Sequence, residues 1–248
     1  MKKSFGDFGK LVKNYKAMRP NYPNRIIKDI YTEIKKLSPL ILDLGCGTGI
    51  STRQLAKGSG SVIGCDIDNY MLKNARKDNH KNIKYIKGNA ERLPFTNNSF
   101  DVVTMFTSFH WFTTKKAIAE IRRVLKPNSI ICVVQPSYKS SFRRELREII
   151  NQTLKLGIKP KYKSKKFPKF LSENKFRITK TKIYKTINKY TLSQFLQLLQ
   201  SISTWAYVPI YKRKDILELL KIHYSKVLKN NRIYDPIEVQ LICAESKD

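Results

Sequence analysis

The sequence predicts an α/β fold organised around a doubly wound parallel sheet. Three observations support this prediction. Residues 40–52 read L-I-L-D-L-G-C-G-T-G-I-S-T, an apolar strand followed by a glycine loop and the start of a helix. Residues 61–66 form a second short apolar run that also ends in an acidic residue. From there to residue 135, helical and strand patterns alternate, as they do in proteins with a parallel sheet.

The predicted elements of the first half are separated by recognisable stop and capping signals. Residues 24–37 have apolar side chains near helical spacing, and Ser38 and Pro39 end this helix before the first strand. Asp68 or Asn69 is suited to cap the helix that follows the second strand. We expect the remaining helices at residues 50–57, 70–77 and 114–125, and strands at 40–42, 61–66, 83–87, 101–106 and 130–135.

The second half predicts longer and less regular elements, without an internal repeat or a separate domain. We expect an inserted helix and a lysine-rich loop up to residue 168, a strand at 176–189, helices at 190–203 and 215–228, and a last strand at 237–244. The chain is therefore interpreted as one domain over residues 1–248. Its parts are an N-terminal flap and helix (1–37), a cofactor-binding core (38–136), and helical cap elements with the last two strands (137–248).

The glycine loop is the first indication of function. Gly45, Gly47 and Gly49 allow a tight turn and let a ligand approach the backbone without a Cβ in the way. The spacing does not match the G-x-G-x-x-G of dinucleotide sites, and no lysine follows to make a phosphate loop. The remaining pattern, D-x-G-x-G-x-G from Asp43 onward, presents free backbone N–H groups to a different cofactor.

Asp66 supports a cofactor site at the same place. It ends the second strand, one helix and one strand after the glycines, where doubly wound cofactor domains place the carboxylate that binds ribose hydroxyls. The alternative is that Asp66 only caps the next helix. Asp68 and Asn69 are better placed for that task, so we favour the ribose role.

A third stretch is similar to one protein family. Residues 88–103 read G-N-A-E-R-L-P-F-T-N-N-S-F-D-V-V, which resembles the G-D-A-E-x-L-P-F-x-D-x-S-F-D-x-V of the methyltransferase type 11 family, among the class I S-adenosylmethionine-dependent methyltransferases. The further motifs R-P-x-Y-P, F-H-W-F and R-V-L-K-P most resemble the trans-aconitate methyltransferase-like branch. The resemblance implies a seven-stranded Rossmann-like sheet, a C-terminal antiparallel hairpin, a helical substrate cap and S-adenosyl-L-methionine as cofactor.

The resemblance also implies which residues form the cofactor site. Asn89 replaces an acid that usually accepts a hydrogen bond from the adenine amino group, and its side-chain oxygen can accept the same bond. Ala90 and Glu91 are then expected against the adenine edge. The complete set expected at the cofactor is Tyr15, Asp43, Gly45, Gly47, Gly49, Asp66, Ile67, Met71, Asn89, Ala90, Glu91 and Thr107.

Residues 107–112, T-S-F-H-W-F, should face the reacting end of the cofactor, because they follow the fourth strand. His110 could act as a general base for a hydroxyl or amine acceptor, or it could shape the pocket wall with Trp111. Arg19 could pair with a substrate carboxylate from an N-terminal flap, or the flap could only tie down the terminus. The residues expected at the substrate are Arg19, Tyr22, His110, Trp111 and Trp205, with His110 and Arg19 as the catalytic candidates.

The cysteines do not indicate a metal site. Cys46, Cys65, Cys132 and Cys243 show no C-x-x-C spacing and no nearby histidine, and each lies on or beside a predicted strand. We therefore interpret them as small buried thiols and expect no metal.

A cytoplasmic location is expected from the hydrophobic pattern. No apolar run approaches the roughly 18 residues needed to span a bilayer. The first ten residues, M-K-K-S-F-G-D-F-G-K, lack the apolar core of a signal peptide.

The net charge is strongly positive, with 49 Lys and Arg against 19 Asp and Glu, formally +30. Such a charge attracts polyanions. The best local support for nucleic-acid binding is the lysine-rich stretch at residues 159–169, K-P-K-Y-K-S-K-K-F-P-K. The excess is spread over the whole chain, however, and no recognition motif accompanies it. A compositional origin is therefore favoured over nucleic-acid binding.

Together these features predict O-methylation of a small carboxylic acid. One alternative is an RNA or protein methyltransferase that uses the lysine-rich surface. Another is a cofactor-binding protein that has lost catalysis; Asn89 hints at this, while the intact glycines and Asp66 argue against it. No feature indicates an oligomeric state.

Overall fold

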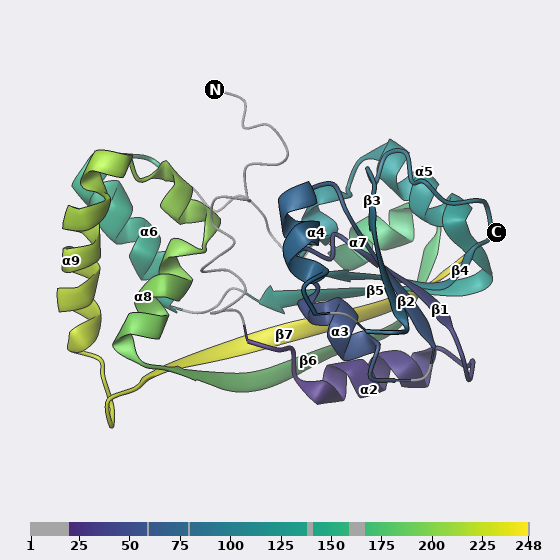
Figure 1. Cartoon of the computed structure of the whole chain (residues 1–248), viewed down its shortest axis with the longest axis horizontal. Helices are drawn as coiled ribbons and strands as arrows, with labels where there is room; N and C mark the ends of the chain where they lie inside the picture. Colours follow the sequence, from purple (N-terminus) through teal and green to yellow (C-terminus); the bar gives the residue numbers. More distant parts are fainter. Residues whose placement is uncertain (1–19, 59, 79, 138–140, 159–166, 248) are drawn as a thin grey trace.

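The computed structural model of the chain describes residues 20–58, 60–78, 80–137, 141–158 and 167–247. These residues form a seven-stranded sheet with helices on both faces and a separate group of helices at one end (Figure 1). The strands are β1 (Leu40–Leu44), β2 (Ser61–Asp66), β3 (Ile83–Lys87), β4 (Phe100–Phe106), β5 (Leu125–Ser137), β6 (Phe176–Tyr190) and β7 (Ile233–Ser246).

The order of the strands in the sheet is β3-β2-β1-β4-β5-β7-β6. Strands β1 to β5 pair in parallel, whereas β7 is antiparallel to both β5 and β6. The predicted doubly wound sheet with an antiparallel C-terminal pair is therefore confirmed. The sequence order reverses between β1 and β4, so the ends of these strands are where a doubly wound sheet binds its ligand.

The helices of the sheet domain divide between its two faces. Helices α2 (Asn24–Glu33) and α3 (Ile50–Leu55) contribute isoleucine and leucine side chains to one apolar core, and α5 (Lys115–Val124) and α7 (Phe167–Glu173) contribute to the other. The short helices α4 (Asn69–Ala75) and η2 (Phe109–Trp111) follow the carboxyl ends of β2 and β4. Both therefore lie next to the ligand-binding edge of the sheet.

A helical group at the far end of the molecule has a hydrophobic core of its own. Strands β6 and β7 extend beyond the rest of the sheet, and the connection between them carries most of this group (Figure 1). Buried side chains from several elements meet there, including Phe195, Trp205 and Tyr224. The group consists of α6 (Ser141–Leu154), α8 (Leu192–Gln200), η4 (Ser203–Tyr207), η5 (Ile210–Lys212) and α9 (Arg213–Ser225).

The structure refines several predicted boundaries. The first helix ends at Glu33, four residues early, and Leu37 is 90% exposed. Strand β5 begins at Leu125, earlier than predicted, and α7 falls partly in the stretch expected to be a lysine-rich loop. Of the two proposed helix caps, Asp68 is the correct one, because its side chain accepts hydrogen bonds from the first turn of α4.

The four cysteines are buried free thiols, as predicted. Cys132 on β5 and Cys243 on β7 face each other across the antiparallel pair, with their sulfur atoms 3.2 Å apart. None of the helices in the described ranges is long and apolar enough to cross a membrane.

Candidate active site

The glycine loop that follows β1 holds all three glycines in the left-handed region. The φ angles are 71° at Gly45, 56° at Gly47 and 79° at Gly49. A Cβ on Gly45 would lie 2.6 Å from the Cβ of Ser108, and one on Gly49 would collide with the Tyr85 hydroxyl. A Cβ on Gly47 would meet nothing within 4 Å. Gly47 is therefore the glycine whose backbone is open to an approaching ligand.

Asp43 supports this loop from beneath. It is fully buried at the end of β1 and accepts hydrogen bonds from the hydroxyls of Ser51 (2.7 Å), Thr52 (2.7 Å) and Thr104 (3.0 Å). Burial raises the pKa of its carboxyl group, and the three hydroxyl donors partly offset that rise. We expected Asp43 to contact the cofactor. In the structure the fully buried Asp43 side chain joins β1, α3 and β4, so it supports the loop from below, and its contact with the cofactor stays a prediction.

Asp66 lies beside the loop at the end of β2. Its Oδ2 accepts a hydrogen bond from the N–H of Gly47 at 2.8 Å, and its Oδ1 accepts one from the N–H of Asp68 at 2.9 Å. Burial raises the pKa of the Asp66 carboxyl, while those backbone donors lower it. Each oxygen retains a second lone pair, so the carboxylate can still accept hydroxyl donors. The adjoining Ile67 is 39% exposed and Met71 is buried in α4.

The turn after β3 contains the three residues expected at the adenine. Asn89 is exposed, and its Oδ1 accepts a hydrogen bond from the N–H of Glu91 at 2.9 Å. Glu91 in turn accepts a hydrogen bond from the Thr114 hydroxyl at 2.8 Å, and Ala90 is buried. The oxygen of Asn89 therefore holds the turn and has only one lone pair left for an adenine amino group.

On the opposite side of the loop, Tyr22 joins three elements of the site. Its backbone exchanges two 2.8 Å hydrogen bonds with the side chain of Gln54 on α3. Its hydroxyl shares a 2.8 Å hydrogen bond with Thr107, which follows β4 with a φ of 55°. Its ring packs on Phe106 with the centroids 4.8 Å apart. Tyr22 and Thr107 thus form one side of the entrance to the loop.

His110 and Trp111 lie next to this entrance on η2, with ring centroids 4.8 Å apart. The preceding residue, Phe109, is fully buried and packs edge-on against Phe167 of α7 at 5.0 Å. Helix α7 therefore fixes the position of η2, and the two rings stay at the carboxyl end of β4.

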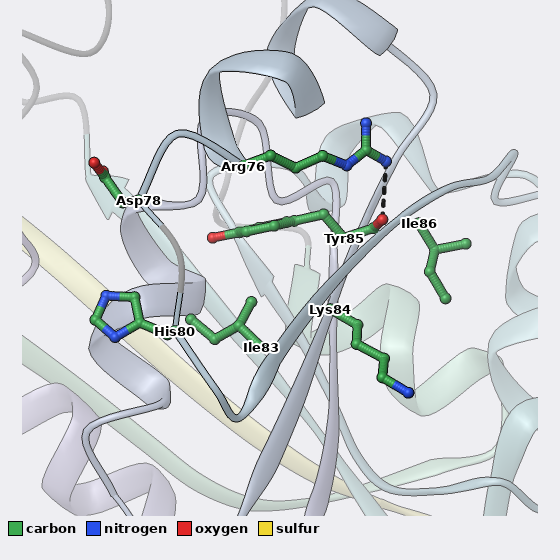
Figure 2. A pocket seen from close by; sticks show the side chains of 7 residues that line it. All are labelled: Arg76, Asp78, His80, Ile83, Lys84, Tyr85 and Ile86. Atoms are coloured by element: carbon green, nitrogen blue, oxygen red, sulfur yellow. Dashed lines mark hydrogen bonds between the residues drawn. The ribbon is translucent and has the colours of Figure 1, made fainter.

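A cavity of about 40 Å³ lies between Tyr22 and the glycine loop. The Thr48 hydroxyl is buried in its wall and has no hydrogen-bond partner among the described residues. Our sequence analysis missed Thr48, although its position between Gly47 and Gly49 could have indicated it. A larger hollow of about 360 Å³ lies beside β3 (Figure 2) but shares no residue with the loop. We place the ligand site at the smaller cavity because it has the open backbone of Gly47 and the unpaired Thr48 hydroxyl. Cavity volume does not decide between the two.

The remaining candidates lie elsewhere. Trp205 is 2% exposed in the core of the helical group, where it packs among apolar side chains, and its contact with substrate stays a prediction. Tyr15 and Arg19 lie outside the described residues, as does the stretch 159–166 of the lysine-rich segment.

Comparison with known proteins identifies the segment that contains the loop. Residues 42–133 match a family model described as a methyltransferase domain.

Curated proteins that are similar in sequence also match only part of the chain. A demethylmenaquinone methyltransferase from Corynebacterium kroppenstedtii is 37% identical over 106 residues, 41% of this chain and 45% of its own length. An uncharacterised methyltransferase-like protein from Schizosaccharomyces pombe is 38% identical over 125 residues, 50% of this chain and 48% of its own. The chain thus spans about half the length of the curated relatives it matches.

The fold extends beyond the matched segment. A phosphoethanolamine N-methyltransferase from Haemonchus contortus, solved in complex with S-adenosylhomocysteine, aligns with 99% of this chain and 61% of its own at a TM-score of 0.57. The sequence identity is 18%, so the comparison concerns the fold alone. The structural similarity therefore covers the whole seven-stranded sheet, including the strands outside residues 42–133.

Proposed function

We propose that the chain is an S-adenosylmethionine-dependent methyltransferase whose acceptor is a small carboxylic acid. The observation that carries the proposal is the open backbone at Gly47, with Asp66 bonded to its N–H and the unpaired Thr48 hydroxyl next to it. This arrangement lies at the strand ends of a methyltransferase domain.

The residues present fit this cofactor. Gly47 leaves space that any side chain would fill, and the Thr48 hydroxyl offers an unused hydrogen bond. Asp66 would hold the ribose hydroxyls through its remaining lone pairs, and Ile67, Ala90 and Asn89 would surround the adenine. When bound, S-adenosylmethionine supplies an electrophilic methyl group, which an acceptor takes up with its own electron pair as the carbon–sulfur bond breaks.

The contribution of the chain is mainly positioning and exclusion of water. Tyr22 and Thr107 close one side of the loop, and His110 and Trp111 would form the wall at the acceptor. A carboxylate acceptor has no proton to lose, so it needs no general base. An alcohol or amine acceptor would instead hand its proton to His110.

The proposed carboxylic acid acceptor rests on the resemblance to the trans-aconitate methyltransferase-like branch and on the positive charge of Arg19. Arg19, in the R-P-x-Y-P motif that ends beside Tyr22, would pair with a substrate carboxylate through two parallel hydrogen bonds. Replacing it by Ala should raise the KM for the acid about tenfold or more and leave affinity for S-adenosylhomocysteine unchanged. An unchanged KM would contradict the acidic acceptor.

The cofactor proposal is tested by calorimetric titration with S-adenosylhomocysteine. Gly47→Ala places a methyl group in the open space above the loop, and we expect affinity to fall at least about tenfold. The substitution also strains a left-handed residue, at a cost of about 1–2 kcal/mol in folding free energy. Gly157→Ala is the matched control, since a Cβ there also meets nothing within 4 Å but lies far along the chain from the loop. Equal affinities of the two variants would contradict the site.

Turnover separates the proposed activity from its alternatives. A methyl-release assay against a panel of small acids, quinones and total RNA should give product with an acid. Product with RNA alone would favour a macromolecular acceptor. Binding of S-adenosylhomocysteine without any turnover would favour a cofactor-binding protein that has lost catalysis.

A further inference from the structure

The edge of the sheet at β3 carries a concentration of unpaired cations. Within residues 73–87 there is a single acidic side chain, Asp78, which lies 3.5 Å from the guanidinium of Arg53 on α3. None of the Lys and Arg side chains in this stretch forms an ion pair with a carboxylate of the described residues. All of them are exposed: Lys73, Arg76, Lys77, Lys81, Lys84 and Lys87.

The opposite edge of the sheet shows that such a concentration can be neutralised internally. Strand β6 contains lysines and an arginine and has no acidic residue of its own. Lys180 pairs with Glu33 at 3.0 Å, and Lys182 pairs with Asp29 at 2.7 Å, both on α2. Arg177 pairs with Glu245 on β7. Three of the five cations of β6 are therefore paired within the fold, and Lys185 and Lys189 form no ion pair among the described residues, whereas none of the six cations at β3 is paired in this way.

The β3 edge also contains the largest hollow described above, of about 360 Å³. Figure 2 shows Arg76 extended alongside the Tyr85 ring, with its guanidinium donating a 2.9 Å hydrogen bond to the Tyr85 carbonyl. His80 and Ile83 border the same side of the strand, and Lys84 points to the other side (Figure 2). In the sheet formed by the described residues β3 is an edge strand, so the hollow opens at the sheet edge. Its volume is that of a small-ligand site.

An exposed aromatic ring lies on the same helix as the first of these cations. Tyr70 on α4 is 48% exposed, Lys73 follows it three residues later on the same helical face, and Lys77 lies in the turn after α4, which ends at Ala75. Aromatic rings that alternate with lysines are what single-stranded nucleic acids bind, because bases stack on the rings while phosphates meet the ammonium groups. A small phosphate ligand would contact only the residues that line the hollow. The exposed cations continue along the chain before and after these residues, at Lys73 and Lys87, which suits a longer polyanion.

We propose that α4, the following turn and β3 form a docking surface for single-stranded nucleic acid. Phosphates lie along Lys73, Lys77 and Lys84, and a base stacks on Tyr70. None of these four side chains belongs to the residues expected at the cofactor, so the surface does not depend on the proposed methyl transfer.

The test is fluorescence anisotropy of a labelled oligouridylate of roughly twelve nucleotides with the full chain, at about 50 and 200 mM KCl. The edge variant is K73Q/K77Q/K84Q. The matched control is K214Q/K226Q/K229Q, which removes the same charge from exposed lysines of the helical group and its connection to β7 that form no ion pair among the described residues.

We expect the edge variant to lose about tenfold or more in affinity, and the log–log salt slope to fall by about 2, since each phosphate contact contributes about 0.7 for a single strand. The control should change affinity less than about twofold. Y70A should weaken binding without changing the salt slope, because stacking releases no counterions.

Three results would overturn the proposal. Equal losses in the edge and control variants would mean that total charge alone attracts the oligonucleotide. Equal, edge-dependent binding of a polyglutamate peptide or of phosphatidylserine vesicles would mean an acidic protein or a membrane as partner. No binding by the wild-type chain at the lower salt would exclude the surface. Titration with S-adenosylhomocysteine, expected to be unchanged in the edge variant, reports on the cofactor site separately.

Discussion

The methyltransferase sheet and the helical group are stabilised by different kinds of interior. Ser201 is the buried polar side chain of the helical group, and its hydroxyl only bonds back to Leu198 of its own helix. The sheet domain buries many more polar groups, and most of them surround the glycine loop. They are Asp43, Thr48, Ser51, Thr52, Gln54, Asp68, Thr104, Ser108, Ser129, Gln135 and Asp235.

This difference implies that packing determines the shape of the helical group, whereas hydrogen bonds hold the groups of the ligand site. In the helical group, apolar and aromatic packing sets the positions of α6, α8 and α9, and such packing tolerates volume-conserving changes. At the loop, most polar groups have a directional partner, with the Thr48 hydroxyl as an exception, and losing one partner leaves another group buried without a hydrogen bond. Changes in the first region should therefore alter stability alone, while changes in the second should alter stability and ligand binding together.

The largest expected effect is that of Trp205→Ala in the helical group. Removing a 2% exposed indole leaves a cavity and should lower the free energy of unfolding by about 3–5 kcal/mol, measured by chemical denaturation. Affinity for S-adenosylhomocysteine should not change. Tyr211→Ala on the same group is the control, because that ring is 79% exposed and its loss should cost less than about 0.5 kcal/mol. Altered cofactor affinity in the Trp205 variant would contradict the expectation that changes in the helical group affect stability alone.

The next effect is that of Asp43→Ala beneath the loop. Three buried hydroxyls lose their shared acceptor, and we expect a loss of about 2–4 kcal/mol in unfolding free energy. Cofactor affinity should fall with it, because the loop is no longer held. Thr104→Val removes one of the three donors and should cost about 1 kcal/mol. A destabilised Asp43 variant with unchanged cofactor affinity would show that the loop does not depend on this cluster.

Asp66→Ala should weaken binding of S-adenosylhomocysteine by about 1.5–3 kcal/mol, as expected for losing hydrogen bonds to a charged group. Stability should also decrease, since Gly47 and Asp68 lose their acceptor. Calorimetry combined with thermal unfolding measures both quantities. Asp66→Asn keeps one acceptor oxygen, so its affinity for S-adenosylhomocysteine should lie between those of Asp66→Ala and the wild type. Full affinity in the Ala variant would refute the ribose role.

The smallest effect concerns acid stability, at the face where α2 meets β6. Hydrogen bonds from Lys182 and Tyr184 lower the pKa of Asp29 below its ordinary value of 3.8. A lowered pKa means that the stabilisation is complete above pH 3.8 and is lost as the pH falls through the lowered value. Asp29→Asn should therefore cost about 0.5–1 kcal/mol at neutral pH and nothing in strong acid. A difference that grows toward acid pH would contradict this sign.

The sequence predicted local features of both regions well. The three glycines, Asp66 and the Asp68 cap depend on neighbouring residues and on the order of the strands, so they could be read from the chain. Trp205 could not, because an aromatic residue near a predicted substrate helix has the same sequence signal whether it lines a pocket or fills a core. Its burial depends on the packing of the whole helical group, which includes α6, an element distant from Trp205 in sequence.

The sequence by itself determined the fold class and the position of the glycine loop, because periodicity, turn residues and spacing are local properties. Only the tertiary structure decided which polar groups face a ligand. Asp43 and Asp66 both end strands and look alike in the sequence, yet one is enclosed by three hydroxyls and the other borders the open loop. The tertiary structure likewise distinguished paired from unpaired lysines, because an ion pair depends on which elements lie side by side.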